Sequence, residues 1–312
     1  MRVGLLGLGR IGAFHAATLA AHPLVDELIV ADPVRTSPYG RPGDAFEADA
    51  VVIATPTSTH AELIVKACER GIPAFCEKPV AGTVADTVKV LESSAGNRVQ
   101  IGFQRRFDPG YVAAATALRA GELGELHRVH LVTADPVPPP AEYIPLSGGI
   151  FRDCHIHDFD ILRWVTGREV VSVYAKGANR GAAFFAAAGD VDTSAALLTL
   201  DDGTLATLQG SRYNGGGYDV RMELAGTERT QAVGLSSRAP LHTTEDAPRS
   251  DEPWPDFVTR FETAYRDEID AFLTSDRSPC SIEDALEALY VAEAADLSLR
   301  EHRPVEVAEV RR

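Results

Sequence analysis

The fold of this chain is decided near its start, where residues 7–12 read Gly7-Leu8-Gly9-Arg10-Ile11-Gly12. They match G-x-G-x-x-G directly after the apolar run Arg2–Leu6 and at the start of an alanine-rich segment, so a strand, a glycine turn and a helix are predicted. In this context the first glycine permits a tight turn, the second lets the backbone approach a pyrophosphate, and the third lets helix and strand pack closely. The stretch predicts a dinucleotide-binding α/β domain.

An acidic residue stands where such a domain needs one. Asp32 closes the next predicted strand, Glu27–Ala31, about 20 residues after the last glycine. Its carboxylate can accept both ribose hydroxyls of an adenosine and would repel a 2′-phosphate, so we expect NAD rather than NADP as the cofactor. Arg35 is close enough in sequence to soften that preference. The alternative, an unrelated aspartate beside a glycine-rich turn, explains the three signals in register less well.

Strands and helices are predicted to alternate as far as residue 102. Further strands are expected at residues 50–54, 74–76 and 99–102, and helices at 60–70 and 84–93. This alternation is typical of a parallel, doubly wound sheet. Residues 33–49 are short and rich in proline and glycine, and cannot comfortably hold both the helix and the strand of a full dinucleotide fold. We therefore expect a Rossmann domain trimmed after its second strand, with a more open adenine side and weakened cofactor binding.

The hydrophobic period changes after residue 126. Alternating segments at 127–133, 170–176, 193–200, 204–210 and 219–226 predict strands of a largely antiparallel open sheet. The turn Asp201-Asp202-Gly203 predicts a hairpin, and Ser281 with Asp284 predicts the start of a last helix. We expect an N-terminal Rossmann domain over residues 1–121 and a C-terminal α+β domain over residues 122–312.

Composition narrows the class of protein. The 312 residues are 45% hydrophobic and 24% charged, which is ordinary for a globular protein. A net charge of −15 argues against nucleic acid and anionic membrane surfaces as partners. The four cysteines form no C-x-x-C pair, and neither a signal peptide nor a membrane span is indicated, so a cytoplasmic location is expected.

Two stretches carry candidate catalytic residues. Lys78, in the run C-E-K-P, follows a predicted strand and so lies at the carboxyl end of the sheet, where ligands bind in open α/β folds. Within residues 148–167 a helix is predicted in which Asp153, His157 and Asp160 share one face at i, i+4 and i+7. An aspartate one turn from a histidine can orient the imidazole and stabilise its protonated form. The plain alternatives are a solvated Glu-Lys turn and a polar surface stripe.

The second stretch also allows a metal site. Asp153, His155, His157 and Asp158 could bind a metal for hydrolysis. A nicotinamide cofactor makes a metal unnecessary, because hydride transfer from an alcohol needs only a proton acceptor and a cation near the developing carbonyl. We therefore expect no metal. The sequence has no G-x-S-x-G elbow or Walker lysine for acyl or phosphoryl transfer.

These motifs resemble the Gfo/Idh/MocA oxidoreductases over nearly the whole chain. The matching stretches are the glycine loop, Asp32, A-T-P-T-S-T-H at 54–60, E-K-P at 77–79, G-F-Q-R-R-F-D at 102–108, and residues 148–164 with D-x-x-x-H. The runs at 102–108 and 153–160 look most like the bacterial inositol 2-dehydrogenase branch. The short segment after Asp32 departs from the family's pattern.

The resemblance implies roles for individual residues. The catalytic set would be Lys78, Asp153 and His157. The cofactor contacts would be Gly7, Gly9, Arg10, Ile11, Gly12, Asp32, Thr55, Pro56, Thr57, His60, Glu77, Lys78 and Gln104. The substrate contacts would be Lys78, Arg105, Asp153, His157, Asp160 and Tyr218.

The resemblance also implies a function. It is the NAD-dependent oxidation of a cyclic polyol hydroxyl to a ketone, with myo-inositol and 2-keto-myo-inositol (scyllo-inosose) as substrate and product in inositol catabolism. The open sheet of the C-terminal, substrate-binding domain would form the face of a homo-oligomer, a dimer or a tetramer. Two alternatives stay open: a dehydrogenase of another inositol isomer or of a pyranose sugar, and a non-catalytic NAD-binding regulator, which the trimmed segment favours.

Overall fold

The chain forms two compact units. The computed structural model describes residues 1–244 and 251–311. The N-terminal unit contains Met1–Phe107 and Thr263–Glu287, and the C-terminal unit contains Asp108–Glu262 and Ala288–Arg312. Among the described residues, no helix combines the length and the apolar character that crossing a bilayer requires.

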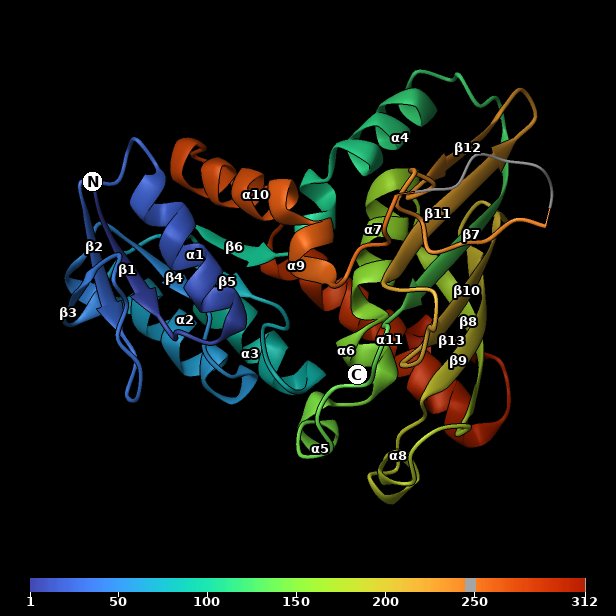
Figure 1. The fold of residues 1–312 in the computed structure, drawn as a ribbon, viewed down its shortest axis with the longest axis horizontal. Coiled ribbons are helices and arrows are strands. Elements are labelled where there is room, and N and C mark those ends of the chain that lie inside the picture. Colours follow the sequence, from blue (N-terminus) through green and yellow to red (C-terminus); the bar gives the residue numbers. More distant parts are fainter. Residues whose placement is uncertain (245–250, 312) are drawn as a thin grey trace. The chain divides into compact units, whose positions relative to one another are not determined.

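The N-terminal unit is built on a six-stranded parallel sheet in the order β3-β2-β1-β4-β5-β6 (Figure 1). Its strands are β1 (Arg2–Leu6), β2 (Glu27–Ala31), β3 (Arg41–Pro42), β4 (Ala50–Ile53), β5 (Ala74–Glu77) and β6 (Val99–Gly102). Its helices are α1 (Arg10–Ala21), α2 (His60–Glu69), α3 (Val84–Ser93) and α10 (Glu262–Thr274), with short 3₁₀ turns η1 (Ala45–Glu47), η2 (Thr57–Thr59) and η3 (Gln104–Phe107). The predicted Rossmann fold is confirmed, and the strand order reverses beside β1, which is where such sheets bind ligands.

The trimming after β2 is also confirmed. The described residues 32–49 contain the two-residue strand β3 and the turn η1, and no α-helix. The turn begins at Asp44, whose carboxylate accepts the N–H of Phe46. Phe46 is buried, so the shortened crossover still covers one end of the sheet.

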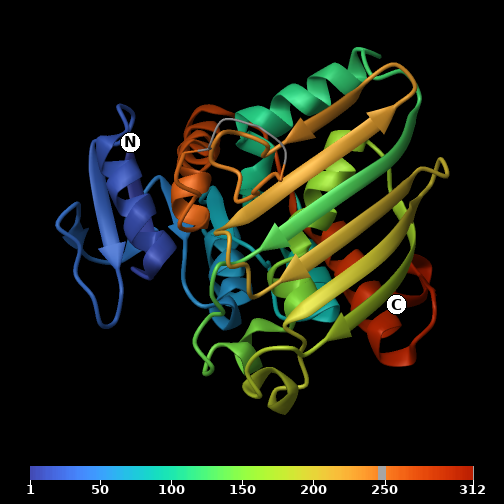
Figure 2. The same ribbon diagram turned by 45° about the vertical axis from the view of Figure 1, so that its right-hand side comes forward.

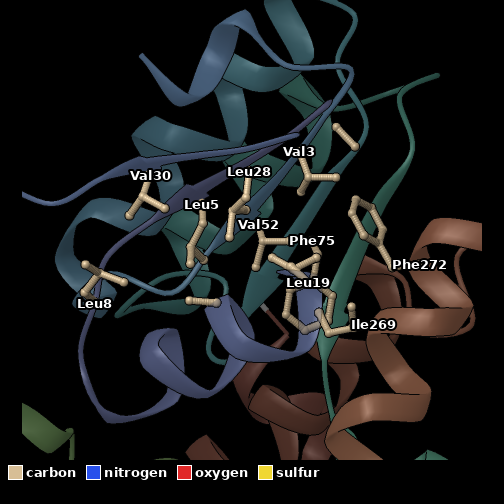
Figure 3. Close-up of a cluster of buried hydrophobic side chains, with 12 residues drawn as sticks. Val3, Leu5, Leu8, Leu19, Leu28, Val30, Val52, Phe75, Ile269 and Phe272 are labelled. Atoms are coloured by element: carbon tan, nitrogen blue, oxygen red, sulfur yellow. The ribbon is translucent and has the colours of Figure 1, made fainter. Parts of the chain in front are cut away.

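Helix α10 completes the core of the N-terminal unit. Ile269 and Phe272 on this helix are fully buried and pack with Val3, Leu5 and Phe75 of the sheet (Figure 3). The units therefore divide differently from the expected boundary after residue 121: the chain leaves the N-terminal unit at Phe107 and returns to it for residues 263–287.

The C-terminal unit is built on a seven-stranded sheet in the order β12-β11-β7-β10-β9-β8-β13 (Figure 2). Its strands are β7 (Leu126–Ala134), β8 (Val170–Ala178), β9 (Thr193–Leu200), β10 (Leu205–Ser211), β11 (Asp219–Gly226), β12 (Thr230–Val233) and β13 (Val305–Glu306). The other elements are α4 (Pro109–Arg119), α5 (Ile144–Ser147), α6 (Ile150–Asp153), α7 (Ile156–Thr166), α8 (Phe184–Ala187), α9 (Phe257–Arg260), η4 (Val307–Val310) and the part of α11 (Ile282–Glu301) that follows Glu287. The sheet is antiparallel except for one parallel pair, β7 with β10.

The two faces of this sheet differ. Along β9, Ser194, Ala196 and Leu198 are buried, whereas Ala195 and Leu197 are exposed. Helices cover one face, as Figure 2 shows, and no helix of the described residues covers the other, which we call the open face. The expected hairpin joins β9 to β10, and Ser281 caps α11 by accepting the N–H of Asp284 at 3.2 Å.

Candidate active site

The glycine loop joins β1 to α1, and its three glycines differ in the space that a side chain would have at each position. Gly7 has φ +91°, and a Cβ there would collide with the carbonyl of Ala54. A Cβ on Gly12 would collide with the carbonyl oxygen of Gly7, so the first and third glycines are required by the fold itself. A Cβ on Gly9 would meet nothing within 4 Å. The backbone at Gly9 therefore faces open space, which suits the close approach of a pyrophosphate.

Asp32 ties the end of β2 to the glycine loop. Its Oδ2 accepts the N–H of Leu8 at 2.7 Å, and its Oδ1 accepts the N–H groups of Val34 and Arg35 at 2.9 and 2.7 Å. The Val34 N–H, assisted by those of Leu8 and Arg35, lowers the pKa of Asp32 below its ordinary value. Asp32 is therefore a carboxylate at neutral pH, as contact with ribose hydroxyls requires.

The shortened segment after Asp32 borders a hollow. It has a volume of about 470 Å³ and is lined by Leu8, Ala13 and residues 34–39. Arg35 is one of the lining residues, and its Nη1 donates to the carbonyl oxygen of Leu8 at 2.6 Å. The side of the fold where an adenosine is expected is thus bordered by a loop instead of a helix.

The loops after β4 and β5 lie at the same sheet edge as the glycine loop, because these strands are parallel neighbours. Lys78, directly after β5, is half-buried. Glu77 is bonded to Nε2 of His15 at 2.8 Å. His60 is buried, and its two ring nitrogens lie 2.7 and 2.8 Å from backbone carbonyl oxygens of the two loops.

The remaining expected residues of the N-terminal unit differ in exposure. Gln104 and Arg105, in the turn after β6, are only 3% and 2% exposed. Arg10 and Pro56 are exposed, and Ile11, Thr55 and Thr57 are partly exposed; residues 55–57 begin the loop after β4. Direct contact of these side chains with a ligand stays a prediction.

Asp153 and His157 do not lie on one continuous helix, and that expectation was wrong. Helix α6 ends at Asp153, and α7 begins at Ile156. The intervening Cys154 and His155 keep right-handed helical backbone angles, but the amides of both Cys154 and His155 bond to the carbonyl oxygen of Ile150. Asp153 thus ends one short helix, and His157 stands in the first turn of the next.

Asp153 is held from two sides. Its Oδ1 accepts a hydrogen bond from the hydroxyl of Tyr143 at 2.8 Å, and its Oδ2 accepts one from Nη2 of Arg212 at 2.7 Å. Arg212 also reaches Asp135 at 3.3 Å. The side chains of Arg212 and Asp153 are 4% and 12% exposed, so this ion pair is largely withdrawn from water. Burial and the charge of Asp153 raise the pKa of Tyr143, which keeps the phenol protonated as the donor.

Sequence reasoning missed Tyr143, Asp135 and Arg212. Asp135 directly follows β7, and Arg212 directly follows β10. The two strands are parallel neighbours, with Ala134 opposite Ser211, so their carboxyl ends bring the two residues together. The sequence does show an aspartate and an arginine directly after two predicted strands. This pattern indicates an ion pair only once the two strands are known to be neighbours.

A second polar network lies beneath the open sheet. His155 Nδ1 is 2.8 Å from Asp158, and His155 Nε2 is 2.7 Å from Ser194. Asp158 also accepts the hydroxyl of Thr133 at 2.8 Å. All four residues are at most 5% exposed, so two of the four side chains considered for a metal form an internal hydrogen-bonded network.

The two weaker substrate candidates are both buried. Asp160 is fully buried in α7, and Tyr218, just before β11, is 6% exposed. On the same helix, Phe159, Leu162 and Val165 are each at most 1% exposed and belong to the core of the C-terminal unit.

Comparison with known proteins identifies the family. A model described as the GFO/IDH/MocA C-terminal domain matches residues 111–231, and one described as an oxidoreductase family with an NAD-binding Rossmann fold matches residues 40–103. The chain is 37% identical over 329 residues to inositol 2-dehydrogenase of Rhizobium meliloti (strain 1021), covering 99% of both. The chain belongs to the Gfo/Idh/MocA family of oxidoreductases.

Two further relatives of this Gfo/Idh/MocA oxidoreductase are informative. It is 36% identical over 329 residues to the scyllo-inositol 2-dehydrogenase (NAD(+)) of Bacillus subtilis (strain 168), covering 98% of this chain and 96% of the relative. The solved structure of scyllo-inositol dehydrogenase from Lactobacillus casei with bound NAD(H) and scyllo-inositol matches with a TM-score of 0.86 at 28% identity, covering 99% of each chain.

The cofactor of this Gfo/Idh/MocA oxidoreductase is NAD. The N-terminal unit fits it on three observations: open space at Gly9, an ionised Asp32 at the end of β2, and the hollow beside residues 34–39. The glycine loop would hold the pyrophosphate, and Asp32 would hold the adenosine ribose.

Proposed function

We propose that this enzyme oxidises one ring hydroxyl of a cyclic polyol to a ketone, with myo-inositol as substrate and 2-keto-myo-inositol as product. The observation that carries the substrate class is the 37% identity, over nearly the full length of both chains, to an enzyme named inositol 2-dehydrogenase. A neutral polyol is bound by several fixed hydrogen-bond donors and acceptors, and its site needs no charge opposite to that of the substrate. The polar residues around Asp153 are of that type.

In this proposal His157 is the general base. It takes the proton of the reacting hydroxyl, and Asp153 orients its ring. The bonds from Tyr143 and Arg212 support the role of Asp153, because they use one lone pair on each carboxylate oxygen and restrain its rotation. An orienting carboxylate is useful only if it is itself fixed in direction.

Lys78 is the cation of the reaction in this proposal. Its ammonium group binds the reacting oxygen and stabilises the negative charge that develops there as the proton leaves. When bound, NAD supplies the acceptor for the hydride from the substrate carbon. The position of Lys78 directly after β5, at the edge of the sheet that carries the glycine loop, supports this assignment.

Oligomer and location complete the proposal. The open face of the C-terminal sheet exposes Val171, Leu197 and Leu205 on β8, β9 and β10 by 38%, 45% and 48%. Apolar side chains gathered on one sheet face favour association, and we propose a homo-oligomer, a dimer or tetramer, through this face.

We place the enzyme in the cytoplasm, which agrees with the buried thiols of Cys68 and Cys76, whose pKa values burial raises.

A spectrophotometric screen at 340 nm tests the function. NAD and NADP are each offered with myo-inositol, other inositol isomers and common pyranose sugars, and calorimetry measures NAD binding separately. Reduction of NAD with myo-inositol as the best substrate is the expected result. A better rate with another isomer or a sugar replaces the substrate, and NAD binding without turnover of any polyol favours the regulator.

The variant His157→Ala tests the base. General-base catalysis contributes about 10²- to 10⁴-fold, so kcat should fall by that factor while the Kd for NAD stays nearly unchanged. His242→Ala, at an exposed position of the C-terminal unit, is the matched control and should retain the wild-type kcat. Wild-type turnover in His157→Ala would show that the base is misassigned.

A further inference from the structure

One buried histidine connects the loop after β4 with the loop after β5, which begins with Lys78. His60 is the first residue of α2, and its side chain is 1% exposed. Its Nδ1 lies 2.7 Å from the carbonyl oxygen of Pro79, in the loop after β5. Its Nε2 lies 2.8 Å from the carbonyl oxygen of Thr55, in the loop after β4. The ring therefore bridges the carboxyl ends of two neighbouring strands.

The partners decide the protonation state of this ring. A backbone carbonyl oxygen can only accept a hydrogen bond, whereas a neutral imidazole has one donor nitrogen and one acceptor nitrogen. Either neutral tautomer would place a ring lone pair against a carbonyl lone pair at less than 3 Å. Only the imidazolium donates in both directions. Distances of 2.7 and 2.8 Å also match charge-assisted N–H···O bonds, which are shorter than neutral ones.

We propose that His60 is a buried imidazolium that positions Lys78 by tying the segment after β5 to the loop after β4. Pro79, whose carbonyl it binds, directly follows Lys78 in the chain. On the other side of Lys78, Glu77 is bonded to the buried His15 at 2.8 Å. The backbone of Lys78 is thus fixed through both of its neighbours. The functional part of this inference rests on the role proposed for Lys78.

Two carboxylates on the elements packed against α2 are paired with other side chains. Strand β5 contributes Glu77, which is paired with His15, and helix α3 contributes Asp86, which is paired with Lys89. The other carboxylates of these two helices are Glu92 on α3 and Glu62 and Glu69 on α2; Glu62 lies in the first turn of α2, as His60 does. The two carbonyl dipoles are the direct electrostatic partners of the ring.

Nuclear magnetic resonance of the full-length wild-type protein with ¹⁵N-labelled histidine tests the protonation state directly. The nitrogen shifts and two-bond couplings distinguish the imidazolium from either neutral tautomer, and His60→Gln identifies the signals that belong to His60. We expect both ring nitrogens to carry a proton at pH 7. A neutral tautomer at that pH would overturn the proposal. This readout does not depend on turnover, so it stays decisive even if no polyol is oxidised.

Kinetics test the positioning role. Glutamine can donate to one carbonyl but cannot replace both bonds, and a displacement of about 1 Å at the reacting group can cost about 10²-fold. We expect His60→Gln to lower kcat about 10- to 100-fold per folded molecule and to change the pH profile of kcat. His22→Gln, where the histidine contacts the exposed Asp270, is the matched control and should change neither. If His60→Gln lowers thermal stability but keeps the wild-type kcat and pH profile, the positioning role is refuted.

Discussion

The ion pair between Arg212 and Asp153 gives the sharpest stability prediction. We consider Arg212→Met, which keeps a long side chain in the same space and removes the charge. Asp153 keeps its bond from Tyr143 but loses the 2.7 Å contact and its nearest cation. Asp135, which Arg212 also contacts, loses a partner as well.

The size of the effect follows from burial. The two side chains are 4% and 12% exposed, so water cannot fully replace the lost partner. Breaking a buried pair by removing one member costs about 3 to 5 kcal/mol, and because the Tyr143 bond remains we expect the lower end, about 3 kcal/mol. The double variant Arg212→Met with Asp153→Asn removes both charges, and should recover most of that loss.

Tryptophan fluorescence during urea unfolding is the assay. Both tryptophans of the chain, Trp164 and Trp254, belong to the C-terminal unit, so their emission reports the unfolding of the unit that contains the pair. A double-mutant cycle from the wild type, the two single variants and the double variant gives the coupling energy, which we expect to be about 2 kcal/mol.

The control is Arg229→Met, since Arg229 and Glu122 form a pair that is 57% and 49% exposed. Exposed pairs contribute at most about 1 kcal/mol, so this variant should be nearly neutral. A cost below about 1 kcal/mol for Arg212→Met, with effects that add within about 0.5 kcal/mol in the cycle, would refute the reasoning that the pair is buried and coupled.

Three further predictions concern other parts of the chain. Asp32→Ser should shift the ratio of kcat/KM for NAD over that for NADP toward NADP by about tenfold, a change of about 1.4 kcal/mol, because a repulsive carboxylate is removed while Arg35 remains; an unchanged ratio would contradict this. Burial, and next the charge of Glu77, raise the pKa of Glu268 well above 4.5, so the folded state binds a proton that the unfolded state releases, and stability is lost as pH rises above that value. Glu268→Gln removes this titration. The melting temperature of the variant minus that of the wild type should therefore increase between pH 4.5 and pH 8; a constant difference would count against a protonated Glu268. Leu197→Glu, on the open sheet face, should reduce the mass measured by light scattering to that of a monomer, whereas Leu24→Glu, equally exposed on the N-terminal unit, should not; an oligomer that persists would exclude this face as the interface.

The expectations that depended on local chemistry agree with the structure. The glycine loop, the strand ending at Asp32 and the hairpin at Asp201-Asp202-Gly203 each follow from neighbouring residues, because turn geometry and apolar periodicity are short-range properties. The proline-rich residues 33–49 showed in the same way that one helix is missing. In these cases tertiary contacts reinforce what the local pattern already favours.

The helix containing Asp153 and His157 shows where local reasoning ends. Helical periodicity runs without interruption through Cys154 and His155, and both residues keep helical backbone angles. The break occurs where the ring of His155 bonds to Ser194, on a strand 39 residues further along the chain. A side-chain bond to a distant strand has no signature in the periodicity of either segment.

The sequence by itself determined the class of the protein: a Rossmann domain for NAD, a second domain with an open sheet, and the motifs that carry Lys78 and D-x-x-x-H. Only the tertiary structure decided the partners that give those motifs their properties. The parallel pairing of β7 with β10 brings Arg212 to Asp135, and the neighbouring ends of β4 and β5 place two carbonyl oxygens on the ring of His60. The physical reason is that periodicity and turn residues encode the direction of a strand but not its neighbour, whereas charge and protonation depend on which groups the neighbouring strand brings within 3 Å.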